Sequence, residues 1–124
     1  MIVNKTKNLV IANRVKICNS FFLRLKGLMF TRKLEDDKAL VLVSKKESLI
    51  SNMIHTLFVF YPIDVVWLDK NFNVVDKRLN IRPFTISIIP KKSAKYIIEL
   101  KCDKAKDINL NDKLSIDFSD VISK

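Results

Sequence analysis

The sequence predicts a mainly β protein, an antiparallel β-sandwich or a partly open barrel of seven to eight short strands with one or two short helices. Short β-branched and aromatic runs recur along the chain, turn-forming residues separate them, and helical spacing is clear in one stretch. With 124 residues, 48% of them hydrophobic, the chain can bury the core of one domain. We expect that domain to span residues 8–119, with flexible ends at 1–7 and 120–124.

The first third of the chain predicts strands followed by a helix. Residues 8–18 form one or two short runs in which polar and apolar side chains alternate toward Cys18. Asn19 or Ser20 is a good N-cap, and Gly27 suits the position after a helix that requires a positive φ. We therefore expect a short helix between them, followed by a solvated loop that carries an acidic cluster.

The middle of the chain predicts a meander of neighbouring strands. Residues 53–61 and 63–68 are apolar runs separated by Pro62, which lacks an N–H and belongs at a strand start, a bulge or an edge. A polar turn at 69–71 then lets the chain return as a strand from residue 72. Further strands are predicted at residues 39–43, 76–82, 85–89, 96–100 and 114–118, and a short helix or turn at 103–111.

Composition excludes several classes of site. With one glycine, the chain has no glycine-rich phosphate loop, and with one histidine and two cysteines it has no ordinary zinc set, so we expect no metal and no cofactor. Cys18 and Cys102 lie far apart and are expected to be free thiols rather than a disulfide.

The net charge of +10 raises the question of an anionic partner. The lysines are spread along the chain with few aromatic residues among them, which disfavours nucleic-acid binding and equally fits a lysine-rich surface. The longest uncharged run, Ser48 to Ile63, is shorter than a membrane-spanning helix needs, and the first residues lack the apolar core of a signal peptide. We therefore expect a cytoplasmic protein without a membrane span.

The stretch from residue 52 to 75 contains the polar residues that stand out most. It holds the only histidine, His55, the only tryptophan, Trp67, and one carboxylate, Asp64, inside an apolar run. A buried carboxylate needs a donor or a proton. Two interpretations of Asp64 remain open: it accepts backbone N–H groups around Pro62, or it shares a pocket with His55.

Several motifs between residues 15 and 118 form a recognisable set. They are R-x-x-G-L-M from Arg24 to Met29, the run IHTLFVFYPIDVVWLD at residues 54–69, Pro83, Ala94 and the run YIIEL at residues 96–100. Together these motifs resemble the domain-of-unknown-function 192 family. The resemblance implies a compact β-rich sandwich with little helix, and it implies no activity because the family has no established one.

The chain departs from the family pattern in three respects. Many members carry an N-terminal signal or membrane anchor, which we do not find in this chain. The family usually has a turn ending in glycine after the Glu-Leu pair, and Lys101-Cys102-Asp103 stands here instead. A later Gly-Asp pair is replaced by Asn111-Asp112, a mild change because asparagine tolerates left-handed backbone geometry.

Five polar residues make up the candidate ligand-binding site: Arg24, His55, Thr56, Asp64 and Glu99. If these separate segments converge, they form a polar pocket in an apolar frame, as in many small-molecule sites. The alternative is structural, with Arg24 and Glu99 forming an ion pair between helix and sheet and His55 bonding to the backbone.

The favoured function is a non-enzymatic binding module for a small polar ligand or a protein partner, a preference by analogy with other sandwiches. One alternative is a hydrolase or isomerase in which His55 acts as a general base oriented by Asp64 or Glu99. Another is an anionic-polymer or membrane-surface binder that uses the lysines. The sequence leaves the oligomeric state open.

Overall fold

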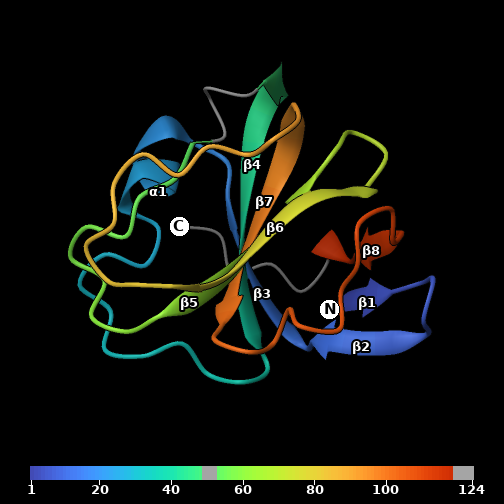
Figure 1. Cartoon of the computed structure of the whole chain (residues 1–124), viewed down its shortest axis with the longest axis horizontal. Coiled ribbons are helices and arrows are strands. Elements are labelled where there is room, and N and C mark those ends of the chain that lie inside the picture. The colour runs from blue at the N-terminus through green and yellow to red at the C-terminus, as the bar shows by residue number, and fades with distance from the viewer. Residues whose placement is uncertain (49–52, 119–124) are drawn as a thin grey trace.

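The computed structural model describes residues 1–48 and 53–118. Over these residues the chain forms eight strands and one α-helix, and the strands build two sheets (Figure 1). The elements are β1 Ile2–Asn4, β2 Leu9–Ala12, β3 Arg14–Cys18, α1 Phe21–Lys26, β4 Lys38–Ser48, β5 Ile63–Leu68, β6 Val74–Ile81, β7 Ala94–Lys101 and β8 Leu114–Ile116. The predicted mainly β, sandwich-like fold is confirmed.

The larger sheet has the strand order β3-β4-β7-β5-β6 within the described part of the chain. The strand β7 lies at its centre and pairs antiparallel with both β4 and β5. The outer strand β3 pairs with β4 in parallel, which corrects the prediction of a purely antiparallel fold. The reason is that α1 and the following loop carry the chain back between these strands, as a parallel pair requires a crossover.

The smaller sheet, in the order β2-β1-β8, corrects the prediction of a flexible N-terminal end. Residues 2–4 form the central strand of this sheet, and the side chain of Ile2 is fully buried. The prediction rested on the position of these residues at the chain end, and that position does not show that they pack into the core. The predicted flexible end at 120–124 lies outside the described residues.

Both faces of the larger sheet are covered. One face packs on the smaller sheet through a core cluster that includes Ile2, Val66 and Ile98. The opposite face packs under α1 and the loops beside it through a second cluster that includes Leu28 and Trp67. Every residue of β5 is therefore buried, which explains why its sequence is almost continuously apolar.

Two predicted strands, at residues 53–61 and 85–89, are wrong. In the structure these segments are loops joined by one isolated bridge, Ile54 to Ile88. The hydroxyl of Thr56 replaces a regular ladder there, since it donates to the carbonyl of Arg82 at 2.7 Å and accepts from the N–H of Thr85 at 2.8 Å. The segment predicted as a helix or turn at 103–111 forms turns.

The predicted helix is confirmed as α1. The Ser20 hydroxyl accepts a hydrogen bond from the Leu23 N–H at 3.1 Å, and Gly27 follows the helix with φ at +45°. The helix has six residues and is the one helix among those described, and no helix there is long and apolar enough to cross a bilayer.

Cys18 and Cys102 are free thiols, as predicted.

Candidate functional site

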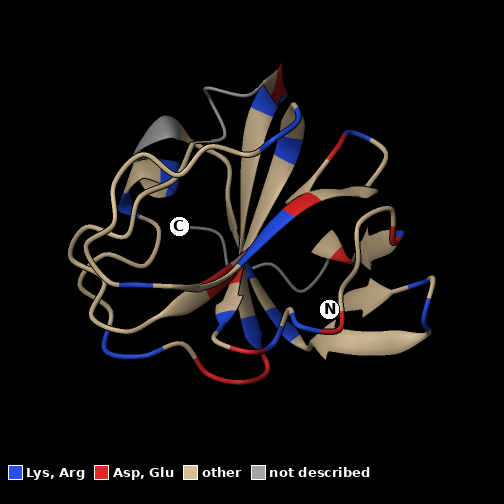
Figure 2. Cartoon of the chain, viewed as in Figure 1, with Lys and Arg blue, Asp and Glu red and all other residues tan. Residues whose placement is uncertain are grey.

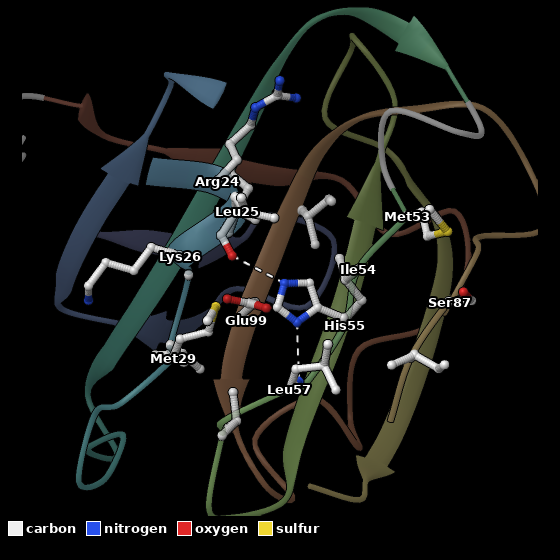
Figure 3. A pocket seen from close by; sticks show the side chains of 16 residues that line it. Arg24, Leu25, Lys26, Met29, Met53, Ile54, His55, Leu57, Ser87 and Glu99 are labelled. Atoms are coloured by element: carbon white, nitrogen blue, oxygen red, sulfur yellow. Dashed lines mark hydrogen bonds between the residues drawn. The ribbon is translucent and has the colours of Figure 1, made fainter. Parts of the chain in front are cut away.

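A pocket of about 510 Å³ lies between α1, the loop that follows residue 52 and the centre of the larger sheet (Figure 3). Most of its lining is apolar and includes Leu28, Met29, Leu42, Met53, Leu57 and Ile97. This volume lies within the range of about 300–1,000 Å³ typical of small-molecule sites. The pocket is on the sheet face opposite the smaller sheet, because Leu42 and Ile97 belong to the second core cluster.

Glu99 is the acidic residue that lines this pocket among the described residues. It lies on β7 between Leu40 of β4 and Val65 of β5, and only 4% of the residue is exposed. Its Oε1 atom is buried and has no hydrogen-bond partner. Burial disfavours the charged form and raises the pKa of Glu99 to about 7, so the carboxyl changes charge near neutral pH.

Gly27 permits the close approach of α1 to Glu99. Its φ of +45° is a conformation that other residues adopt at a cost, and a Cβ added there would lie 3.3 Å from Glu99 Oε1. The G-L-M motif and the YIIEL run, which are far apart in the sequence, therefore meet at one wall of the pocket. Their contact gives a physical reason for a glycine at this position.

His55 connects the loop to the end of α1. Its Nδ1 atom accepts a hydrogen bond from the Leu57 N–H at 3.1 Å, so Nδ1 carries no proton. In the neutral ring the proton is then on Nε2, which donates to the Leu25 carbonyl at 3.2 Å (Figure 3). The interpretation that His55 bonds to the backbone is confirmed.

Arg24 lines the pocket, but it does not pair with Glu99. The structure shows no ion pair between them among the described residues, and Figure 3 shows the guanidinium of Arg24 pointing away from Glu99. The Arg24 Nε atom is buried without a hydrogen-bond partner. The predicted structural ion pair is therefore wrong, and the pocket wall contains an unpartnered donor as well as an unpartnered acceptor.

Asp64 lies on the other side of the sheet from the pocket. Alternation along β5 directs Val65 to the pocket side and Asp64 toward the smaller sheet. Its Oδ1 accepts from the Asn80 N–H at 2.9 Å and its Oδ2 accepts from the Ala105 N–H at 3.0 Å. The interpretation that Asp64 and His55 share a pocket is wrong, and the backbone groups it holds are not those around Pro62.

The structure thus brings together three of the predicted site residues, Arg24, His55 and Glu99, and places two elsewhere. Thr56 is fully buried and holds two loops together. The sequence reasoning missed Gly27 and the methionines at the pocket wall as site residues. The signal that could have found Gly27 is its status as the chain's only glycine, next to a helix end.

The groups that line the pocket offer hydrogen bonding and charge pairing, and Lys26 and Ser87 line it as well as Arg24, His55 and Glu99. No group of three or more His, Cys, Asp or Glu side chains in the described part of the chain is arranged to hold a metal ion. Glu99 can donate when protonated and accept when ionised, and Arg24 Nε can donate. Both nitrogens of His55 are already engaged with the main chain.

Fold and site together define a small β-sandwich with an apolar pocket closed at its base by one buried carboxyl. The chain belongs to the DUF192 family, whose profile, described as an uncharacterized ACR, matches residues 2–118. The resemblance seen in the motifs is therefore confirmed.

Archaeal relatives carry the family name UPF0127. One from Pyrococcus horikoshii is 44% identical over 99 residues, which cover 80% of this chain and 82% of that protein. One from Thermococcus sibiricus is 42% identical over 99 residues, and the match covers 80% of this chain but only 62% of that protein. The chain therefore spans less than two thirds of the Thermococcus sibiricus relative.

Two solved structures share the fold. A protein of unknown function from Novosphingobium aromaticivorans aligns with a TM-score of 0.77 at 16% identity, over 82% of this chain and 74% of that chain. A protein from Sinorhizobium meliloti, described as a putative transcription regulator, aligns with a TM-score of 0.76 at 18% identity, over 82% of this chain and 79% of that chain. At these identities the likeness shows the fold alone.

Proposed function

We propose that the chain is a non-enzymatic binding module for a small ligand with an apolar body and a polar head. The observation that carries the proposal is the buried, unpartnered Glu99 Oε1 at the base of an apolar pocket of about 510 Å³. A buried polar atom without a partner is costly, and a ligand that supplies a donor removes that cost. The pocket has enough volume for such a ligand.

The groups around Glu99 favour a ligand head that donates hydrogen bonds. The Leu25 carbonyl at the end of α1 already accepts from His55, and the basic side chain of Arg24 points away from the carboxyl. An amine suits the ionised carboxyl and an amide suits the protonated one. A second polar group on the ligand, an acceptor, would satisfy the Arg24 Nε–H.

The geometry supports binding over catalysis by His55. A general base needs a nitrogen lone pair that faces the substrate. The Nδ1 lone pair of His55 accepts the Leu57 N–H, and Nε2 faces the Leu25 carbonyl. In this arrangement His55 positions the loop and the helix end, and the walls of the pocket depend on it.

The test uses n-hexylamine, hexanamide and hexanoate, which share an apolar body of similar length and differ in the head group. Binding is measured by NMR chemical-shift titration at several pH values. Since the pKa of Glu99 is about 7, its ionised fraction rises about tenfold from about pH 6 to about pH 8, and hexylamine affinity should rise with it. Hexanoate should bind worst at the higher pH because it repels the ionised carboxyl.

The matched variants are Glu99→Gln and Asp64→Asn, which each replace a buried carboxyl by an amide on opposite faces of the sheet. Glu99→Gln should abolish the pH dependence of hexylamine binding, and Asp64→Asn should retain it in the folded fraction. Equal binding of all three probes, or the same pH dependence in Glu99→Gln, counts against Glu99 as the ligand's anchor.

A further inference from the structure

Four exposed phenylalanines form a continuous row of rings beside the pocket. Phe30 stacks on Phe58 with ring centroids 4.9 Å apart, Phe58 meets Phe84 at 5.9 Å, and Phe84 meets Phe60 at 5.5 Å. The exposed fraction is 67% at Phe30 and 59% at Phe60. We call these four residues the aromatic edge. A contiguous exposed apolar surface of this kind marks an interaction site more often than scattered single residues do.

Three loops hold the aromatic edge in place. The Phe30 N–H donates to the Phe58 carbonyl at 2.9 Å, and the Phe84 N–H donates to the Thr56 carbonyl at 2.8 Å. Figure 1 shows these loops gathered next to α1, at the opposite end of the molecule from the smaller sheet. The rings are therefore displayed by a hydrogen-bonded framework.

The backbone of the aromatic edge is unusual for bulky residues. Phe30, Phe58 and Phe84 have φ values of 62°, 57° and 60°, in the left-handed region that bulky side chains rarely adopt. Burial of these rings in the core does not offset the strain, because the rings are exposed. Strained residues that persist outside the core point to a role in function.

The loops of the aromatic edge carry charge of one sign only. Within residues 28–33, 56–62 and 82–87 the charged residues are Arg32, Lys33 and Arg82 (Figure 2). None of the three forms an ion pair with another described residue. The acidic cluster that follows in sequence, residues 35–37, is paired with Arg14 and Lys101. The surface therefore combines exposed aromatic rings with uncompensated positive charge.

We propose that the aromatic edge docks on the surface of an anionic lipid bilayer. Aromatic rings favour the level of the lipid headgroups, and basic residues near the surface of an anionic leaflet are attracted to it. The rings are exposed on turns and loops, a placement from which they can enter a soft interface, and the basic residues of these loops complement anionic headgroups. This assigns membrane contact to one end of the molecule and not to the dispersed lysines.

The docking surface adjoins the pocket. Phe30 shares a shallow hollow with Leu25 and Met29, and both of these residues also line the pocket above Glu99. Ile86, which is largely exposed, lines the pocket on the other side. Docking would bring the apolar pocket wall near the lipid phase, but the docking proposal stands on the aromatic edge alone.

The test is co-sedimentation with vesicles of phosphatidylcholine, either pure or containing about 30% phosphatidylglycerol, an anionic lipid. The main variant is Phe30→Asn/Phe84→Asn, chosen because asparagine tolerates the left-handed backbone. Phe60→Ser is a second variant at a ring without positive φ. The matched control is Leu9→Thr/Val10→Thr, which removes two exposed apolar side chains from β2 in the smaller sheet.

The wild type should partition onto the anionic vesicles, and the partition coefficient of the Phe30→Asn/Phe84→Asn variant should be about tenfold lower. The partition coefficient of Arg32→Gln/Arg82→Gln should fall about fivefold for each charge removed, and that of the control should stay close to wild type. Glu99→Gln should bind the anionic vesicles as the wild type does, although it should alter ligand binding in the pocket. This variant therefore separates the membrane proposal from the pocket proposal.

Two results overturn the proposal. One is the absence of vesicle binding by the folded wild type at low salt, including the case in which the aromatic edge instead joins two copies of the chain into a dimer. The other is vesicle binding that the Phe30→Asn/Phe84→Asn and Phe60→Ser variants retain in full while thermal unfolding shows them folded.

Discussion

Asp64 and Glu99 are buried carboxyls on neighbouring strands of one sheet, yet their surroundings differ completely. Asp64, on the face toward the smaller sheet, accepts two backbone N–H groups at 2.9 and 3.0 Å. Glu99, on the pocket face, has an unpartnered oxygen and a pKa raised to about 7 by burial. A buried carboxyl with all its donors supplied by the chain is structural, whereas one without them leaves room for a ligand.

Two other buried carboxyls resemble Asp64. Asp76 accepts the N–H groups of Lys77 and Lys91, and Asp112 accepts from the side chain of Asn4 and the N–H of Asn109. Glu99 is therefore the exception among the buried carboxyls of the described residues. This contrast, rather than burial itself, directs attention to the pocket.

The largest change in the free energy of unfolding is expected for Asp64, the carboxyl whose donors are all supplied by the chain. Asp64→Ala removes the acceptor from two N–H groups, those of Asn80 and Ala105, which anchor β6 and a loop to β5. Loss of two hydrogen bonds to a charged acceptor should lower the free energy of unfolding by about 4 kcal/mol. Urea unfolding of the variant measures this, and a loss below about 1 kcal/mol contradicts a structural role for Asp64.

On the pocket side, replacing the buried carboxyl is expected to raise the free energy of unfolding and not to lower it. The pKa of Glu99 is raised from the ordinary 4.5 to about 7, so the folded protein holds this proton more tightly than the unfolded chain. The contribution of protonated Glu99 to the stability of the folded protein is fully present below about pH 4.5 and is lost as the pH rises through 7. Glu99→Gln removes the cost of the buried charge and should raise the free energy of unfolding by about 3 kcal/mol at pH 8.

The measurement is urea unfolding of the wild type and of Glu99→Gln between about pH 4.5 and 8. The difference between them should grow from about pH 4.5 to about pH 7 and level off as the pH approaches 8. A difference that stays constant across the window shows that Glu99 titrates as an ordinary exposed glutamate. Asp64→Asn is the matched control, and it should lower stability instead of raising it at pH 8.

The sequence predicted the features that depend on local chemistry. The helix between Ser20 and Gly27, the strand at 63–68 and the free cysteines follow from capping, β-propensity and cysteine spacing. The conclusion that Asp64 must find donors also follows from elementary solvation energetics. These inferences need no knowledge of which strands pair.

The features that depend on register could not be predicted. Asp64 and His55 were candidates for one pocket because they are close in sequence, but one strand position decides the face to which Asp64 points. The meeting of Gly27 with Glu99 depends on β7 lying between β4 and β5, a long-range pairing that no local pattern shows. Residues 53–61 have strand composition, but the Thr56 hydroxyl bonds make them a loop.

A smaller change in the free energy of unfolding is expected for Thr56→Val, which tests how strongly hydrogen bonds hold the loops on the pocket face of the sheet. Thr56→Val preserves the shape of the side chain but removes the hydroxyl that donates to the Arg82 carbonyl and accepts from the Thr85 N–H. The Thr85 N–H loses its acceptor, whereas the Arg82 carbonyl keeps the hydrogen bond that the Thr85 hydroxyl donates at 2.7 Å, so the free energy of unfolding should fall by about 2 kcal/mol. Thermal unfolding is compared with that of Thr85→Val, which removes the more exposed of the two hydroxyls that donate to this carbonyl and leaves the Thr85 N–H bonded to Thr56.

The smallest effect concerns the contact between α1 and Glu99. Gly27→Ala places a methyl group on a backbone at φ +45° and ψ −121°, which side chains rarely adopt, and 3.3 Å from Glu99 Oε1, so two separate costs add to about 1.5 kcal/mol. A double-mutant cycle separates them, because Glu99→Ala removes the contact and leaves the backbone cost of about 1 kcal/mol. If Gly27→Ala costs the same in both backgrounds, the glycine serves the backbone alone, and its proximity to the pocket carboxyl is incidental to stability.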